Sequence, residues 1–365
     1  FTRVPEDSQV YSLQTDLIGN FNTGSVKHQL LLGFELSRSI SEYEFGIVAS
    51  FPSIDIFNPV YGSPIPTNFD EGFGAKTTTD NVGLYLQDQV TLLPNLKLLI
   101  GGRFDFVNSN VENFPDLING SDSETSNSYN EAFSPRVGLV YQPIEPISLY
   151  TSYSRSFVPN SARTATGELL EPTRGTQYEV GIKAELLDDR LSTTLAAYEI
   201  TKTNVATTNP NDTDFSIAAG EVKSRGIELD IAGQLAPGWN IIASYGLNDS
   251  FVSKDNSIPE GDRLVNAPRN SASLWTTYEI QGGSLQGLGF GAGLFFVGDR
   301  AAELPNTITI PSYVRTDATI FYRRDNWRTA LNFKNLFDIK YYDSQGFLLY
   351  PGAPLTVLGS VSVEF

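Results

Sequence analysis

The sequence of 365 residues contains no cysteine, no methionine and one histidine, His28. The absence of cysteine excludes disulfide bonds, thiolate metal sites and cysteine nucleophiles. A single histidine leaves no room for a histidine-based zinc site, so most acid–base chemistry would have to depend on carboxylates. Because methionine is absent, Phe1 is not an initiator residue, and no signal peptide is visible. We therefore expect the sequence to be an excerpt of a longer chain or a processed product.

Charged residues are scarce, and those of one sign dominate. They make up 18% of the chain, against about 25% in an ordinary soluble domain. The 42 acidic residues outnumber the 25 basic ones, which gives a net charge of −17. Phosphate binding requires clustered Lys and Arg, and no basic run occurs anywhere. These features exclude nucleic acid as a main partner.

Long apolar segments are also missing. No apolar run approaches the roughly 18 residues that a membrane helix needs, which excludes a helical membrane protein. A membrane barrel is still compatible with the sequence, because its strands need only about 9 to 11 residues of alternating character. The abundance of Tyr, Phe and Gly favours strands and tight turns over helices.

Alternation of apolar and polar residues with period two is the dominant pattern. It is clearest in residues 26–38, where Leu30, Leu32 and Phe34 interleave with Gln29, Gly33 and Glu35. Similar segments predict about fifteen strands. In the predicted strand 190–202, the pattern does not decide which side chains form the apolar face. The predicted strands span residues 9–21, 26–38, 79–92, 95–107, 132–142, 146–157, 175–186, 190–202, 221–234, 239–251, 270–279, 287–298, 312–323, 327–338 and 353–365.

The connections between these segments alternate between short and long. The short ones are 22–24, 93–95, 143–146, 187–189, 236–238, 281–286 and 324–326. The long ones, rich in Asn, Asp, Ser, Pro and Gly, are 39–78, 108–131, 158–174, 203–220, 252–269, 299–311 and 339–352. An up-and-down antiparallel sheet with short turns at one rim and long loops at the other is typical of bacterial outer-membrane barrels.

The soluble alternative is a β-sandwich, a propeller or a secreted β-domain. Strands of soluble sheets average about five or six residues, whereas the predicted ones are about as long as a tilted bilayer crossing. The polar faces also carry mid-strand charges, such as Glu179, Lys183 and Glu228. Such charges are costly in a dry core and natural in a wet barrel interior. The predicted fold is therefore all-β, a transmembrane antiparallel β-barrel of the outer membrane.

The last segment indicates the orientation of the chain. Val357, Val361, Val363 and the terminal Phe365 share one face. A terminal Phe on an amphipathic strand resembles the signal that outer-membrane barrels present to the barrel assembly machinery. With this end in the periplasm, every short turn is periplasmic and every long loop is external.

Nine segments occur in the order found in TonB-dependent siderophore receptors, and they cover essentially the whole chain. They are VGLYLQDQV (82–90), GGRFDF (101–106), FSPRVGLVY (133–141), SLYTSYSRSFVP (148–159), QYEVGIKAEL (177–186), SRGIELD (224–230), GAGLFFVGDR (291–300), PSYVRTDATIFYR (311–323) and NLFDIKYY (335–342). The chain most resembles the ferrichrome-type, ferric-hydroxamate branch. The resemblance implies an outer-membrane receptor and transporter for a ferric siderophore, energised through TonB, and not an enzyme.

The barrel of that family has about 22 strands and a plugged interior, and its N-terminal plug follows a short segment that engages TonB. Neither is recognisable here, so residues 1–365 look like the C-terminal portion of the barrel, with the plug and first strands missing. Residues 1–8 would be the tail of an external loop. A sheet that lacks its first strands exposes backbone N–H and C=O groups at its edges, and lipid cannot form hydrogen bonds with them. We expect the missing part to exist in the native protein, or the gene to be broken.

The resemblance also implies where the ligand binds. In the family, aromatic side chains of the external loops and the plug hold hydroxamate siderophores, and the siderophore supplies all the iron coordination. The matching positions are Tyr43 and Phe45, in the loop after strand 26–38, and Phe347 and Tyr350 in the last loop. The alternative is that these rings only pack the loops. We expect no catalytic residue, no protein metal ligand and no resident cofactor.

Other conspicuous residues are interpreted structurally. Glu179, Lys183, Gly226, Glu228 and Asp317 are expected to form a wet interior ladder that meets the plug. Tyr341 and Tyr342 are expected in the outer aromatic belt, and His28 at the membrane interface near a periplasmic turn.

The expected partners are a ferric siderophore, the TonB complex through the missing part, outer-membrane lipid and the assembly machinery. Within transport, the alternatives are a plugless porin or a receptor for cobalamin or haem. Outside transport, they are an outer-membrane enzyme or a glycan-binding β-protein.

Overall fold

The computed structural model describes residues 2–48, 54–55, 57–62, 71–118, 120–160, 164, 170–209, 211, 216–345 and 348–364. Every regular element in these segments is a β-strand. No helix in the described residues is long and apolar enough to span a membrane.

The strands are numbered in chain order. They are β1 (Thr2–Arg3), β2 (Glu6–Thr23), β3 (Val26–Ile47), β4 (Glu71–Leu93), β5 (Leu96–Asn113), β6 (Glu124–Ile144), β7 (Ile147–Val158), β8 (Thr173–Leu186), β9 (Leu191–Thr208), β10 (Ser216–Ala236), β11 (Trp239–Lys254), β12 (Asn270–Glu279), β13 (Leu288–Val297), β14 (Arg300–Ala301), β15 (Thr309–Ile310), β16 (Tyr313–Arg324), β17 (Trp327–Lys334), β18 (Tyr342–Gln345), β19 (Leu348–Pro351) and β20 (Thr356–Val363).

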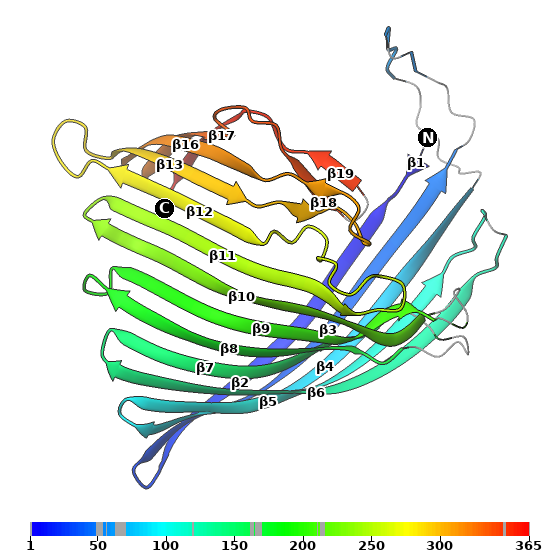
Figure 1. Cartoon of the computed structure of the whole chain (residues 1–365), viewed down its shortest axis with the longest axis horizontal. Coiled ribbons are helices and arrows are strands. Elements are labelled where there is room, and N and C mark those ends of the chain that lie inside the picture. The colour runs from blue at the N-terminus through cyan, green and yellow to red at the C-terminus, as the bar shows by residue number, and fades with distance from the viewer. Residues whose placement is uncertain are drawn as a thin grey trace. The chain divides into compact units, whose positions relative to one another are not determined.

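The long strands form one meandering sheet (Figure 1). Its hydrogen-bonding order runs β1-β3-β4-β5-β6-β7-β8-β9-β10-β11-β12-β13-β16-β17-β20, and β2 also pairs with β3. Each of the fifteen predicted strands corresponds to one of these long strands, and the short and long connections alternate as predicted. The sequence pattern did not predict the short strand β1 at the start of this path. It also did not predict the hairpins β14–β15 and β18–β19, which form separate two-stranded sheets.

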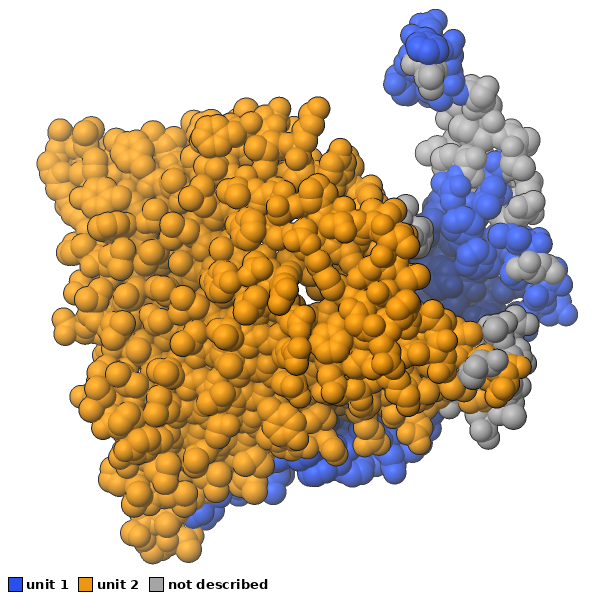
Figure 2. Space-filling view, in the orientation of Figure 1, with its two compact units in different colours: residues 1–22, 28–88, 101–135 blue, residues 23–27, 89–100, 136–365 orange. Residues whose placement is uncertain are grey.

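The chain divides into two compact units (Figure 2). The first comprises residues 1–22, 28–88 and 101–135, and the second comprises residues 23–27, 89–100 and 136–365. The first unit therefore contains most of β2, β3 and β4, with parts of β5 and β6. The second contains the strands from β7 to β20.

Within the second unit, the two faces of the sheet differ in character. Tyr150 on β7 pairs with Gly181 on β8, and the residues flanking Gly181, Val180 and Ile182, expose 58% and 43% of their surface. Glu179, two residues from Gly181, lies with it on the opposite, polar face. Gly181 is required there, because a Cβ atom would lie 2.5 Å from the Tyr150 ring. Large exposed apolar side chains on one face are expected where lipid replaces water.

Polar pairs lie at both ends of the apolar face in the first unit. On β3, His28 and Arg38 share the face of Leu30 to Leu36 by alternation. His28 Nδ1 lies 2.7 Å from Asp88 Oδ2, and Arg38 Nε lies 2.6 Å from Asp80 Oδ1. The strand between the two pairs is about 33 Å long, or about 25 Å of membrane thickness at the usual tilt. The interfacial position of His28 stays a prediction.

Tight turns join successive strands at the end of the sheet that carries the short connections. Leu187, Asp188 and Asp189, between β8 and β9, all have left-handed backbone angles, with φ of 56°, 57° and 62°. Arg190 Nε donates to the Leu187 carbonyl over 2.8 Å and closes this turn. The turn brings β8 and β9 into continuous register from Leu186↔Leu191 onward.

Candidate ligand-binding site

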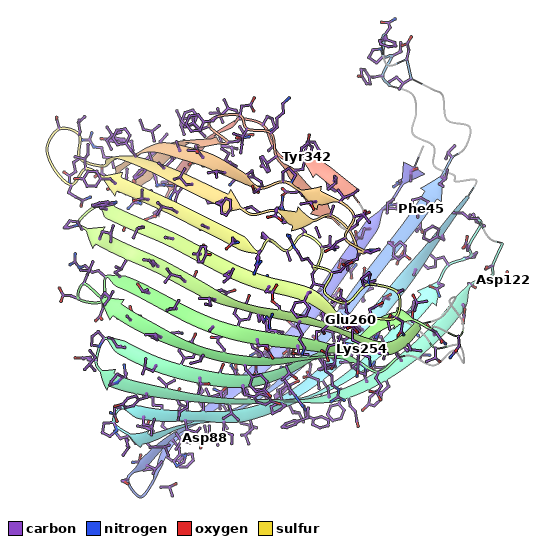
Figure 3. The ribbon with its side chains drawn as sticks, viewed as in Figure 1. Phe45, Asp88, Asp122, Lys254, Glu260 and Tyr342 are labelled. Carbon is purple, nitrogen blue, oxygen red and sulfur yellow. The ribbon has the colours of Figure 1, made fainter. Side chains whose placement is uncertain are left out.

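An aromatic cluster lies at the long-loop end of the first unit. Phe45 on β3 stacks on Phe73 of β4, with ring centroids 5.0 Å apart and planes at 29°. Tyr43 meets the same Phe73 edge-on, at 6.5 Å and 83°. Figure 3 labels Phe45 near this end of β3 and Asp88 near the opposite end of β4. Residues 35, 43 and 45 share one face by alternation, so the two rings lie on the polar side of the strand, with Glu35.

The segment after β5 pairs with the beginning of β4, beside this cluster. Phe114 N–H donates to the Gly74 carbonyl over 2.9 Å, and Leu117 N–H donates to the Gly72 carbonyl over 2.8 Å. A Cβ atom on Gly72 would lie 2.5 Å from the Phe45 carbonyl oxygen, so only glycine allows this close approach. Asp116 fixes the turn that follows, because its carboxylate accepts the Ile118 N–H over 2.9 Å.

An open cavity of about 350 Å³ lies at this end of β3 and β4. Phe45, Phe73, Phe114 and Leu117 supply apolar walls, and Glu44 also lines it. A cavity with aromatic walls and one carboxylate can hold an organic ligand by stacking and a few hydrogen bonds.

The predicted position of Tyr43 and Phe45 in a loop is wrong. Both residues lie on β3, which continues to Ile47 instead of ending at residue 38. The strand continues because β1 pairs with its end, through Thr2↔Ile47 and Arg3↔Gly46. β4 correspondingly begins at Glu71, eight residues earlier than predicted. The two rings therefore lie on a hydrogen-bonded sheet.

Tyr350 belongs to the second unit. It lies on β19, opposite Asp343 of β18, and 43% of its surface is exposed. The fourth predicted residue, Phe347, falls outside the described residues. The structure thus places Tyr43 and Phe45 in one cluster with Phe73, which the sequence pattern did not identify.

Arg300 fastens the β18–β19 hairpin. Its side chain is 4% exposed, and it donates to Asp343 Oδ1 over 3.2 Å and to the Tyr342 carbonyl over 2.6 Å. The guanidinium carbon also lies 5.6 Å from the centre of the Tyr313 ring. Among the residues that the structure describes, its buried Nε atom has no hydrogen-bond partner. The hairpin that presents Tyr350 is therefore held by a buried cation at the start of β14.

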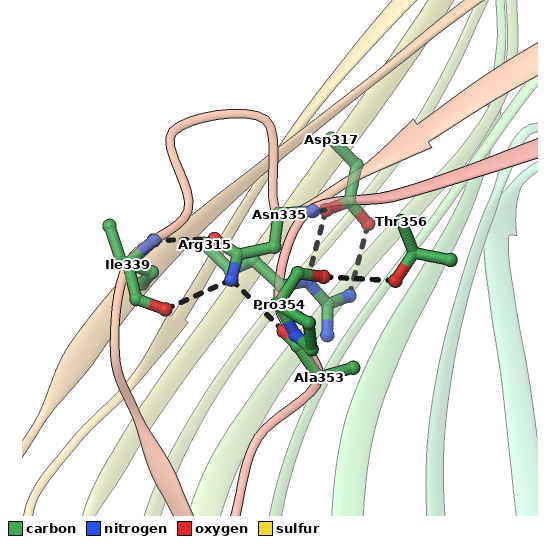
Figure 4. Close-up of polar contacts among 7 residues, drawn as sticks. All are labelled: Arg315, Asp317, Asn335, Ile339, Ala353, Pro354 and Thr356. Carbon is green, nitrogen blue, oxygen red and sulfur yellow. Dashed lines mark hydrogen bonds and ion pairs between the residues drawn. The ribbon is translucent and has the colours of Figure 1, made fainter.

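Asn335 organises the long segment between β17 and β20 (Figure 4). It is 1% exposed and ends β17 with a φ of 53°. Its Nδ2 donates to the Ile339 and Ala353 carbonyls over 2.9 and 3.0 Å, and its Oδ1 accepts the Ile339 N–H over 2.9 Å. Its backbone N–H donates to Asp317 Oδ1 over 2.9 Å. One side chain therefore joins the two ends of the segment.

The expected aromatic belt at Tyr341 is wrong. Tyr341 is 9% exposed, and its ring lies 4.5 Å from the Tyr313 ring. The strand ends at Lys334 because Asn335 and Asp338 adopt positive φ, and the chain then turns back onto the sheet. Asn and Asp are turn-forming residues, so the motif NLFD carried a signal for this turn.

Two other long loops of the second unit are joined by polar contacts. Arg263 Nη1 donates to Asp299 Oδ2 over 2.8 Å, and Asn306 N–H donates to Asp262 Oδ2 over 2.8 Å. The hydrogen bond from Arg263 lowers the pKa of Asp299, and partial desolvation opposes this shift. These contacts therefore join the loop after β11 to the loop after β13. Arg300, in the loop after β13, connects them in turn to the β18–β19 hairpin.

The residues expected in an interior ladder lie on the polar faces of their strands. Glu179 accepts hydrogen bonds from Tyr150 and Gln177, and Asp317 forms a two-point ion pair with Arg315. Contact of these residues with a plug stays a prediction. In the described part of the chain, no group of three or more His, Asp or Glu side chains is placed to hold a metal ion.

A sequence model of the family described as TonB dependent receptor-like, beta-barrel matches residues 1–336. The chain belongs to this family. It is accordingly an outer-membrane β-barrel protein, and the family consists of receptors and not of enzymes.

Known proteins of this kind resemble the chain along nearly its whole length. The Metal-pseudopaline receptor CntO of Pseudomonas aeruginosa is 36% identical over 96% of this chain and 51% of its own length. The Ferrichrome outer membrane transporter/phage receptor of Escherichia coli is 30% identical over 93% of this chain and 46% of its own. The resemblance to ferrichrome-type receptors expected from the motifs is thus confirmed. The chain spans about half the length of the curated relatives it matches.

A solved structure supports the fold directly. The siderophore receptor PiuA from Acinetobacter baumannii superposes with a TM-score of 0.80 and 25% identity. The superposition covers 98% of this chain and 56% of PiuA.

Proposed function

We propose that the protein is an outer-membrane receptor and transporter for a ferric siderophore, energised through TonB. The observation that carries the proposal is the cluster of Tyr43, Phe45 and Phe73 on the polar face of β3 and β4, at the long-loop end. In a barrel of this family, that face lines the interior. Rings at the mouth of the interior suit a bulky metal chelate that is bound by stacking and arrives with its iron already coordinated.

The proposed mechanism requires no covalent chemistry. The outer rim captures the chelate, TonB supplies energy from the inner membrane, and the chelate passes through the interior to the periplasm. The hydroxamate class is the proposed ligand, because aromatic walls favour a neutral or weakly charged chelate. Lipid and the barrel assembly machinery are the proposed partners in membrane insertion.

The proposed ligand class has one specific rival. A relative at 36% identity is named for a metal–pseudopaline complex. A metal chelate other than a ferric hydroxamate is therefore included among the ligands to be tested.

Uptake by intact cells tests the function. The full-length protein that contains this chain would be expressed in a bacterium lacking its own siderophore receptors, and entry of radioactive iron measured with ferrichrome-like and citrate-hydroxamate chelates. We expect saturable uptake that disappears in a strain lacking TonB. If the receptor binds no ferric chelate in any assay, the proposed function is wrong.

We also propose that residues 1–365 form the C-terminal portion of the barrel of a longer receptor. The chain covers about half of each relative, which supports this division. The DNA upstream of the codon for Phe1 tests it. A plug domain preceded by a TonB-binding segment is expected there, whereas a start codon immediately before Phe1 would contradict the proposal.

A further inference from the structure

An open, largely apolar cavity of about 580 Å³ lies on the face of the sheet that carries Val180 and Ile182, here called the outward face. Thr151 of β7 also lines it, and its hydroxyl group donates to the Glu179 carbonyl over 3.1 Å. On β9, the small side chain of Ala197 lies opposite Val180. In a barrel of this family, the outward face meets lipid. The cavity therefore suits hydrocarbon chains.

Two tyrosines lie on the outward face beside this cavity, toward the long loops. Tyr153 of β7 pairs in register with Tyr178 of β8, and their ring centres are 5.2 Å apart. Each is two residues from a cavity residue, Thr151 or Val180, so alternation directs all four side chains outward. Tyrosine rings favour the level at which hydrocarbon meets lipid headgroups. The two rings therefore mark this level at the long-loop end of β7 and β8.

Two exposed arginines follow the tyrosines on the same strands. Arg155 is two residues beyond Tyr153, and Arg174 is four residues from Tyr178, so both share the outward face. Arg155 pairs in register with Thr176, which makes Arg174 its diagonal neighbour. Such neighbours are separated by about 7 to 8 Å. Two guanidinium groups at this spacing can bind the same phosphate group.

The two arginines have no carboxylate beside them on their own strands. β7 contains no acidic residue, and the two glutamates of β8, Glu179 and Glu185, lie on the opposite face. Within the described part of the chain, neither Arg155 nor Arg174 forms an ion pair within 4.0 Å. Adjacent like charges destabilise a strand pair. A phosphate group bound between them would offset this repulsion.

The charges on the neighbouring strands compensate one another. Arg225 of β10 lies opposite Glu199 of β9 and forms an ion pair of 3.0 Å with Asp249 of β11. Lys223 lies 3.5 Å from Glu221 on β10. These five groups together carry one net negative charge, so the excess of cations on the outward face is confined to β7 and β8.

Glu171, which precedes β8, accepts a hydrogen bond from Asn204 Nδ2 over 3.2 Å. It forms no ion pair with Arg174 in the segments that the structure describes.

We propose that the outward face of β7 and β8 binds one lipid molecule of the outer leaflet, with a phosphate group held by Arg155 and Arg174 and an acyl chain in the apolar cavity. Thr151 and Arg155 are separated by about 13 Å of strand, so a single lipid reaches both. The orientation predicted for the chain puts the long loops outside the cell, and the lipid there is a phosphorylated glycolipid. The inference depends on the outer-membrane position of the family and not on the proposed transport function.

Lipid binding by the purified receptor tests this site. The full-length protein that contains this chain would be delipidated in detergent and titrated with lipid A carrying two phosphate groups, and bound lipid counted by native mass spectrometry. Arg155→Gln with Arg174→Gln should raise the Kd at least about tenfold. For wild type, removal of both phosphate groups from lipid A should have an effect of similar size. The double variant should bind the two forms of lipid A equally.

Three further variants serve as controls. Arg155→Lys with Arg174→Lys keeps both charges and should bind within about fivefold of wild type, because lysine lacks the planar fork of arginine. Arg225→Gln removes an exposed arginine that already has a carboxylate partner and should change the Kd less than twofold. Ala197→Phe fills part of the cavity and should raise the Kd at least threefold while the preference for phosphate persists.

Several results would overturn the proposal. One is binding of lipid A by the double glutamine variant with wild-type affinity, and another is an equal loss of affinity in Arg225→Gln. Equal binding of both forms of lipid A by wild type would do so without any variant, so a folding defect cannot obscure the result. If phosphatidylglycerol binds as tightly as lipid A, the surface contacts anionic lipids in general and the glycolipid site is wrong. Failure of the receptor to bind any ferric chelate would bear on the proposed function alone.

Discussion

The aromatic cluster of the first unit and the joined loops of the second unit are stabilised in different ways. Tyr43 and Phe45 contact Phe73 through ring surfaces, on strands that the sheet already holds in place. In the second unit, Arg300 and Asn335 are buried polar side chains that fix segments with little regular structure of their own.

The difference indicates which region can exchange its contacts for those of a ligand. Ring contacts are non-directional, so a bound chelate can replace them at small cost. Buried hydrogen bonds are directional, and a donor or acceptor that loses its partner costs about 1 to 3 kcal/mol. We therefore expect the cluster to respond to ligand and the joined loops to hold their backbone in place.

The largest effect is expected from Asn335→Ala. The substitution removes three side-chain hydrogen bonds at a site that is 1% exposed, and it leaves buried partners unsatisfied. The free energy of unfolding should fall by about 2 to 4 kcal/mol. Limited proteolysis should then cut within residues 335–355. Asn326→Ala, which removes one exposed hydrogen bond to the Glu364 carbonyl, is the matched control, and equal sensitivity of the two variants would contradict the role of Asn335.

A smaller effect is expected from Arg300→Met. This change keeps a long side chain but removes the contacts with Asp343 and the Tyr342 carbonyl, at a cost of about 1 to 2 kcal/mol. The hairpin β18–β19 should become accessible to protease while the rest of the sheet stays resistant. Arg300→Lys should be intermediate, because an ammonium group cannot form both contacts with the same geometry. Full resistance of Arg300→Met would show that the hairpin is held by other contacts.

Phe45→Ala should leave stability nearly unchanged and weaken binding of the ferric chelate. Loss of one ring contact with the chelate corresponds to about 1 kcal/mol, or roughly a fivefold increase in Kd. Titration by fluorescence quenching measures this change. Phe337→Ala, at a residue 71% exposed in the second unit, is the control and should bind as wild type. An unchanged Kd for Phe45→Ala would show that the cluster is not part of the binding site.

The smallest effect concerns pH. Because Arg263 lowers the pKa of Asp299 in the folded protein, the pair stabilises the loops fully above the unfolded Asp pKa of about 3.9. This stabilisation is lost as pH falls below that value, through the lowered folded pKa. Both groups are partly exposed, so the contribution should stay below about 1 kcal/mol. Acid titration followed by proteolysis of the loop after β13 should show this step in wild type and not in Arg263→Gln.

The sheet was predictable from the sequence because alternation is a local pattern. All fifteen long strands coincide with predicted ones, and Tyr43 and Phe45 were identified as candidates. Their partner Phe73 was not, because it reaches them only through strand pairing, which local patterns do not encode. The burial of Tyr341 was missed for the same reason, since it depends on Tyr313 from a distant strand.

The two polar pairs on the apolar face of β3, His28–Asp88 and Arg38–Asp80, restrict the bilayers that suit this protein. A thicker membrane would draw one pair into hydrocarbon, where partly exposed charges are costly. A thinner one would leave leucine and phenylalanine side chains in water. The protein should therefore favour a membrane of matched thickness and, in a poorer match, tilt or deform the lipid around it.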